Sequence, residues 1–158
     1  MKKIFTLFII IILTAGYAMA AQMTKFSGKF IKKFQDCDSY TETVTSEFEG
    51  ETFTTTRKII GWENGMCKYQ SIISSHKEKY RLDCSFSEMQ VEELYNAMKS
   101  RSKNTERYTL DLFAPQTDPK TGEIIYKRAG NTIIKGNKAY IAWTKYENNP
   151  YFCKPNKL

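Results

Sequence analysis

Four cysteines constrain this chain more than any other feature, because covalent cross-links between distant segments limit the ways in which it can fold. They are even in number and contain no C-x-x-C pair: Cys37, Cys67, Cys84 and Cys153. The single histidine, His76, is not spaced from them as a zinc ligand would be. An even cysteine count favours disulfides over metal ligation in a small chain that is exported, and the amino terminus described next predicts export. We therefore expect two disulfides, no metal site and no cofactor.

The amino terminus has the three parts of a secretory signal. Lys2-Lys3 forms a basic start, residues 4–13 form an apolar run, and Ala18-Met19-Ala20 supplies the small residues that precede a signal-peptidase cut. The apolar run is about ten residues long, too short for the roughly 20 that cross a bilayer. An uncleaved membrane anchor is the alternative, because residues 14–20 extend the run weakly.

This signal sets the expected domain organisation. We expect residues 1–20 to be a signal peptide that is cleaved before Ala21, and residues 21–158 to form a single exported domain. No other apolar run is long enough to span a membrane. The product is therefore expected in the periplasm or outside the cell, with no transmembrane span after cleavage. The short Lys-Lys start and the alanine-rich cleavage site are typical of bacteria.

Strand and turn patterns dominate the remaining sequence. Phe26, Phe30 and Phe34 recur at helical spacing and predict a helix over residues 24–35. Ser87 and Gln90 form a capping box that predicts a second helix. Strands are expected at residues 38–48, 51–62, 66–75, 79–86, 108–112, 123–127, 132–135 and 138–145, with a loop at 114–122. The predicted fold is α+β, a mainly antiparallel sheet of meander hairpins with one or two packed helices, stabilised by disulfides.

The cysteine pairing depends on the register of one predicted hairpin. Four cysteines allow three pairings, and spacing alone does not choose among them. A turn at Ser75-His76 would place Cys67 opposite Cys84, where cross-strand side chains are near enough to bridge. Cys37 and Cys153 would then pair by elimination. We predict this connectivity.

The sequence holds no recognised catalytic motif. It lacks a G-x-S-x-G elbow, an H-E-x-x-H pair and a glycine-rich phosphate loop. His76 is expected at an exposed hairpin tip, and oxidised cysteines offer no thiolate nucleophile. These absences lean against an enzyme. A small envelope hydrolase with an unidentified carboxylate site stays open as an alternative.

Basic and aromatic side chains are interleaved in the final third of the chain. The candidate surface for an anionic partner comprises Lys127, Arg128, Lys135, Lys138, Tyr140, Trp143 and Lys145. Such a surface can attract an anionic envelope component or an acidic protein, whereas nucleic acid is not expected after export. The plainer alternative is that these lysines only keep outer strand faces soluble.

Together these features favour a non-catalytic binding or interaction protein of the bacterial periplasm or cell envelope. A peripheral membrane-active factor is a further alternative, because the lysine-rich helix of Phe26, Phe30 and Phe34 could lie on a membrane surface. Packing of this helix on the sheet is the interpretation that we favour, since a small domain needs the apolar area.

Overall fold

The computed structural model describes residues 26–48, 50–76, 78–100 and 104–157. The predicted signal peptide and its cleavage site lie outside these residues. The strands are β1 (Tyr40–Phe48), β2 (Glu51–Glu63), β3 (Met66–Ser74), β4 (Lys79–Phe86), β5 (Glu106–Thr117), β6 (Ile124–Gly136) and β7 (Cys153–Lys157). The helices are α2 (Gly28–Gln35), α3 (Glu88–Lys99) and α4 (Lys138–Glu147). The predicted disulfide-stabilised α+β fold is confirmed.

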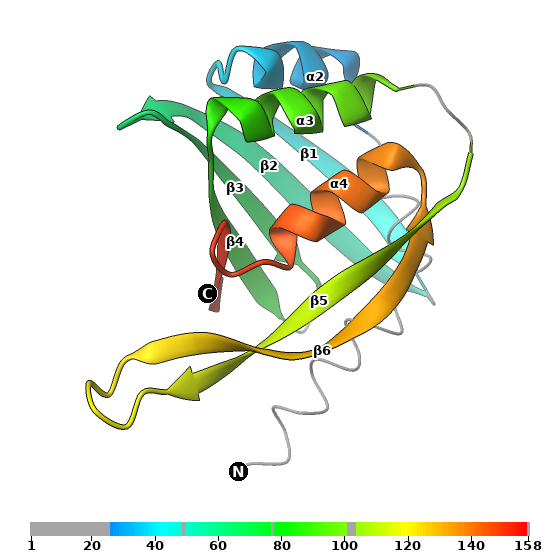
Figure 1. Cartoon of the computed structure of the whole chain (residues 1–158). Coiled ribbons are helices and arrows are strands. Elements are labelled where there is room, and N and C mark those ends of the chain that lie inside the picture. Colours follow the sequence, from blue (N-terminus) through cyan, green and yellow to red (C-terminus); the bar gives the residue numbers. More distant parts are fainter. Residues whose placement is uncertain (1–25, 49, 77, 101–103, 158) are drawn as a thin grey trace.

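One antiparallel sheet forms the body of the molecule, with strand order β1-β2-β3-β4-β7. Helices α2, α3 and α4 lie on one face of this sheet, which we call the inner face (Figure 1). The opposite face, the outer face, carries no helix in the described part of the chain. Strands β5 and β6 form a separate two-stranded hairpin that crosses in front of the sheet and projects past it (Figure 1).

Local sequence signals account for the regular parts of this fold. Asn64 and Gly65 both have positive φ, of 52° and 74°, and join β2 to β3 in a tight turn. Asn-Gly is preferred there because the two residues tolerate left-handed backbone. Ser87 and Gln90 form the predicted capping box at the start of α3, with reciprocal hydrogen bonds of 3.4 and 2.8 Å.

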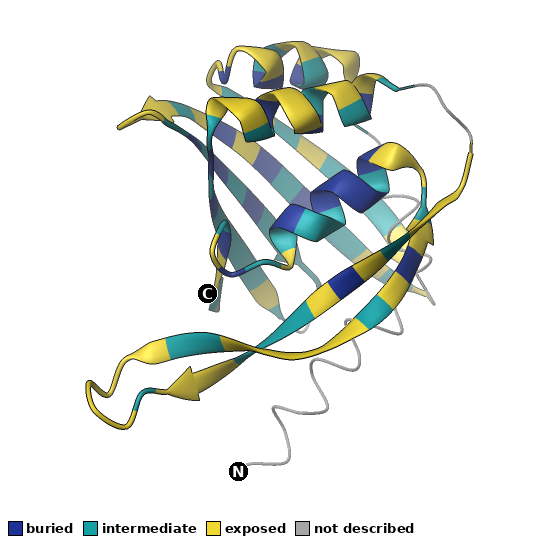
Figure 2. Cartoon of the chain, in the orientation of Figure 1, coloured by how far each residue is buried: buried dark blue, intermediate teal, exposed yellow. Residues whose placement is uncertain are grey.

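The core lies between the helices and the inner face (Figure 2). Phe30 and Phe34 of α2 are completely buried and stack at 5.8 Å between ring centroids. Tyr69 and Phe86 of the sheet meet Trp143 of α4, at 5.0 and 6.0 Å between centroids. The phenylalanine stripe therefore packs on the sheet.

Two expectations about the second half of the chain are wrong. Residues 138–145 form most of helix α4, because the spacing of Ala139, Ala142, Trp143 and Tyr146 buries one helical face. The Asn137 side chain caps this helix by accepting from the backbone of Tyr140 at 2.8 Å. The predicted loop at 114–122 is also partly strand, since β5 continues to Thr117.

The β5–β6 hairpin has a small core of its own. Leu110 and Ile134 on facing strands pack against Ile141 of α4. The segments 123–127 and 132–135, predicted as two strands, form one strand, β6, which begins at Ile124 and shifts register near Gly130. Helix α4 therefore joins the hairpin to the body, because its other buried face completes the main core.

Both disulfides form, but the predicted pairing is wrong. Cys37 bonds Cys67, which links the end of α2 to β3, and Cys84 bonds Cys153, which joins the neighbouring strands β4 and β7. Four residues, 75–78, connect β3 to β4 where we expected a two-residue turn. The register moves by two positions, so Cys67 faces Phe86 and not Cys84.

These disulfides indicate an oxidising, exported environment. Over the described ranges, no helix has the length and apolar character needed to cross a membrane.

Candidate functional site

The structure divides the predicted basic surface between two elements. Lys127, Arg128 and Lys135 lie on β6, whereas Lys138, Tyr140, Trp143 and Lys145 lie on α4. Trp143 does not belong to any surface, because it is only 3% exposed and packs among the core aromatic rings. Tyr140 is half-buried against the small hairpin core. The helical conformation of residues 138–147 turns both rings inward.

Two of the predicted cations, Lys145 and Arg128, are held in ion pairs. Lys145 contacts Glu93 of α3 at 3.0 Å, and the Tyr146 hydroxyl donates to the same carboxylate at 2.5 Å. Burial alone would raise the pKa of Glu93, but the Tyr146 and Lys145 hydrogen bonds lower it below its usual value. Arg128 pairs with Asp111 across the hairpin at 2.7 Å. These cations hold elements of the protein together.

Two of the remaining predicted cations, Lys135 and Lys138, lie at the base of the hairpin beside α4, together with Arg107, which the sequence did not indicate. Lys135 lies directly opposite Arg107 of β5, and Lys138 follows three residues later at the start of α4. All three are exposed, and none forms an ion pair with another described residue. We call Arg107, Lys135 and Lys138 the hairpin-base cations. Lys127 is also exposed but lies farther out, beyond the register shift.

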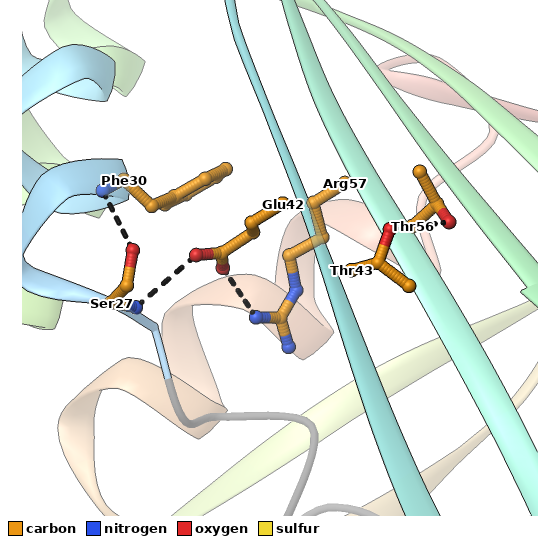
Figure 3. A network of polar contacts seen from close by, with 6 residues as sticks. All are labelled: Ser27, Phe30, Glu42, Thr43, Thr56 and Arg57. Carbon is orange, nitrogen blue, oxygen red and sulfur yellow. Dashed lines mark hydrogen bonds and ion pairs between the residues drawn. The ribbon is translucent and has the colours of Figure 1, made fainter.

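A second set of charged residues lies on the inner face of the sheet. Arg57 of β2 contacts Glu42 of β1 at 2.9 Å, and their side chains are only 3% and 8% exposed. Both point toward the helices, whereas Thr43 and Thr56 point to the other side of the sheet (Figure 3). The backbone N–H of Ser27 donates to the second carboxylate oxygen of Glu42 at 3.4 Å (Figure 3).

Arg57 is the centre of this buried group. Its guanidinium lies 4.3 Å from the ring centroid of Phe26, and Ser71 is its register neighbour on β3. Such a stacked, paired arginine is more easily desolvated than a lysine would be. The sequence pattern did not indicate Arg57, because an arginine in a threonine-rich strand resembles a solvated residue.

Glu147, at the end of α4, interacts electrostatically with the same arginine. Burial raises its pKa to about 7 from a usual 4.5, and the positive charge of Arg57 opposes this shift. The folded state therefore holds a proton on Glu147 more tightly than the unfolded state does. The effect of Glu147 on the free energy of unfolding is therefore absent below pH 4.5, becomes increasingly destabilising as the pH rises from 4.5 to about 7, and is then constant.

This linkage gives a pH-dependent prediction. We expect Glu147→Gln to unfold at the same urea concentration as the parent at pH 4, and to be more stable by about 1–3 kcal/mol at pH 8. Urea unfolding at a series of pH values measures the difference. Glu92→Gln, at an exposed position on α3, is the matched control and should leave the profile unchanged. Parallel profiles for Glu147→Gln and the parent would contradict the prediction.

A shallow groove of about 440 Å³ lies on the outer face beside β7. Its lining includes Lys68, Asp83, Lys154 and Tyr151. Asp83 accepts from Gln70, Arg81 and Asn156, at 2.7, 2.8 and 2.6 Å, so its oxygens are already occupied. With Glu63, the lining holds two lysines and two carboxylates, so its formal charges balance and give no preference for a charged ligand.

His76 lies where the sequence analysis placed it, at an exposed hairpin tip. Its Nδ1 atom is 2.9 Å from a Glu51 oxygen, and its side chain is 65% exposed. In the portion of the chain that the structure describes, no three His, Cys, Asp or Glu side chains are grouped as metal ligands would be.

No known family model, curated protein or solved structure matches this chain. Its function must therefore be inferred from its own residues. Among the described residues, the hairpin-base cations are an exposed charged group and the Glu42–Arg57 pair is a buried one.

Proposed function

We propose that this protein is a small exported binding protein of the bacterial periplasm or cell envelope, and that it does not catalyse a reaction. Its partner would be an anionic envelope component or a protein with an acidic surface. The proposal rests on one observation. Arg107 and Lys135 lie directly opposite each other on the paired strands β5 and β6, and neither forms an ion pair with a described residue.

Strand pairing keeps these two positive charges together. Like charges directly opposite in an antiparallel pair destabilise it, so an anion bound between them would relieve the repulsion. The other three arginines that the structure describes have carboxylate partners: Arg57 with Glu42, Arg81 with Asp83 and Arg128 with Asp111. The contrast supports an external partner for the hairpin-base cations.

The hydrolase alternative would need an accessible pair of carboxylates. Glu42 contacts Arg57 and Glu147 interacts with it electrostatically, but the Glu42 side chain is 8% exposed. Its two oxygens already accept from Arg57 and from the Ser27 backbone. This geometry favours a structural role for Glu42. It therefore supports the proposal that the protein does not catalyse a reaction.

The proposal predicts that charge reversal at the hairpin base abolishes binding. The double variant Arg107→Glu/Lys135→Glu should weaken capture of poly-glutamate, a soluble acidic probe, by about tenfold or more, because attraction becomes repulsion. The same variant should retain fewer proteins and polymers from an envelope extract at low salt. Biolayer interferometry and pull-down with the oxidised protein measure both.

A matched control separates this site from overall charge. Lys32→Glu/Lys58→Glu makes the same change in net charge at two exposed positions away from the hairpin. It should bind nearly as well as the parent, and high salt should weaken binding by the parent. Equal losses in both double variants, or no captured partner at either salt concentration, would contradict the proposal.

A further inference from the structure

The two edges of the main sheet are built differently. Strand β7 has only five residues and carries Lys154 and Pro155, both of which discourage pairing with another strand. The strands of the separate hairpin are also irregular, because β5 contains Pro115 and the register of β6 shifts near Gly130. Features of these kinds protect exposed strand edges from unwanted association.

Strand β1 has none of these protective features. It has nine residues, contains no proline or lysine, and keeps an unbroken register with β2 along its whole length. Its inward-pointing charge, Glu42, is neutralised by Arg57. No strand of the described part of the chain pairs with its outer edge. An edge of this length and regularity is suited to accept another strand.

The hairpin geometry shows which backbone groups are available. Only two residues join β1 to β2, so the closing pair Phe48–Glu51 exchanges its hydrogen bonds. Hydrogen-bonded and non-bonded pairs alternate from there. The backbone N–H and C=O groups of Thr41, Thr43, Thr45 and Glu47 therefore point away from β2, toward the open edge.

We propose that β1 pairs with β1 of a second copy of this chain, antiparallel and centred on Val44. Thr43 of each copy then lies opposite Thr45 of the other, and Thr41 lies opposite Glu47. This register pairs the outward-pointing backbone groups of both strands with each other. It also avoids placing glutamates opposite one another, as pairing Glu47 with its own copy would do.

The side chains of β1 complement themselves in this register. The threonines lie on the outer face and extend the contact between Thr43 and Thr56, whose hydroxyls are 3.1 Å apart. Threonine pairs of this kind stabilise neighbouring strands. Helix α2 approaches β1 near Glu42, through Ser27. Because the strands would run in opposite directions, the two α2 helices would lie toward opposite ends of the interface.

Sedimentation velocity of the exported, oxidised protein over a range of concentrations tests the proposal. We expect the average mass to rise from that of one chain toward that of two. Thr45→Lys places ammonium groups near the dyad and should raise the dimer dissociation constant by about tenfold or more. Thr54→Lys is the matched control, since Thr54 is the register partner of Thr45 one strand inward. It should dimerise as the parent does.

A cross-link tests the register itself. Val44→Cys brings the two copies of residue 44 directly opposite each other in a non-hydrogen-bonded pair, so non-reducing electrophoresis should show a covalent dimer. Ser74→Cys, at the end of β3, should not give one. A parent that stays monomeric at all concentrations overturns the proposal, as does equal dissociation by both lysine variants. Pairing of β1 only with a different protein would also overturn it.

Discussion

Arg57→Ala should lower the free energy of unfolding by about 3–5 kcal/mol, the loss expected when one partner of a buried ion pair is removed. The variant leaves the Glu42 carboxylate with 8% of its side chain exposed and without its cation. It also removes the guanidinium that stacks on Phe26. Urea unfolding followed by far-ultraviolet circular dichroism measures the change.

Two companion variants identify the cause. The double variant Arg57→Met/Glu42→Leu replaces the pair by apolar groups of similar volume and should recover most of the lost stability. Arg81→Ala removes an arginine from the more exposed pair with Asp83, and should cost less than about 1 kcal/mol. A loss below 1 kcal/mol for Arg57→Ala, or no recovery in the double variant, would show that the buried pair contributes little.

Removal of the Cys84–Cys153 disulfide should have the second large effect. Replacing both cysteines by alanine should lower stability by about 4 kcal/mol, because the bond closes a long loop and limits the unfolded chain. The sequence separation is 69, against 30 for Cys37–Cys67, so the loss should be the greater of the two. The same bond holds the five-residue strand β7 on β4.

Thermal unfolding of the two double-alanine variants compares the bonds directly. Hydrogen exchange adds a local readout, because loss of Cys84–Cys153 should release protection in β7 first. Non-reducing peptide mapping of the parent must give the pairs Cys37–Cys67 and Cys84–Cys153. A map with any other pairing, or a larger loss from the shorter loop, would contradict this account.

Local signals predicted much of the fold. The Asn64-Gly65 turn and the Ser87 capping box act within a few residues, so their sequence patterns are sufficient. The predicted β3–β4 register is wrong because the register depends on the number of residues in the turn. Two hydrogen bonds between Ser75 and Glu78, at 2.8 and 3.3 Å, fix that number. Segment 138–145 is a helix and not the predicted strand, because its apolar residues fit both strand alternation and helical spacing.

The charged sites were harder to predict than the elements. In the sequence, Trp143 stands among lysines and resembles a surface aromatic residue. In the structure, helix α4 directs its side chain into the core. Arg107 belongs to the hairpin-base cations because the β5–β6 register places it opposite Lys135, and the sequence does not reveal that register. The buried Arg57 depends on contacts from Phe26 and Glu42, which lie far from it along the chain. Such long-range juxtapositions leave no periodic pattern in the sequence.

The order of the disulfides along the chain has a consequence for biogenesis. Each cysteine bonds its next neighbour in sequence, the first with the second and the third with the fourth. A chain that enters an oxidising compartment amino terminus first would present Cys37 and Cys67 before the later pair emerges. Oxidation in order of arrival then gives the native bonds directly. Maturation of this protein would accordingly need a thiol oxidase but no disulfide isomerase.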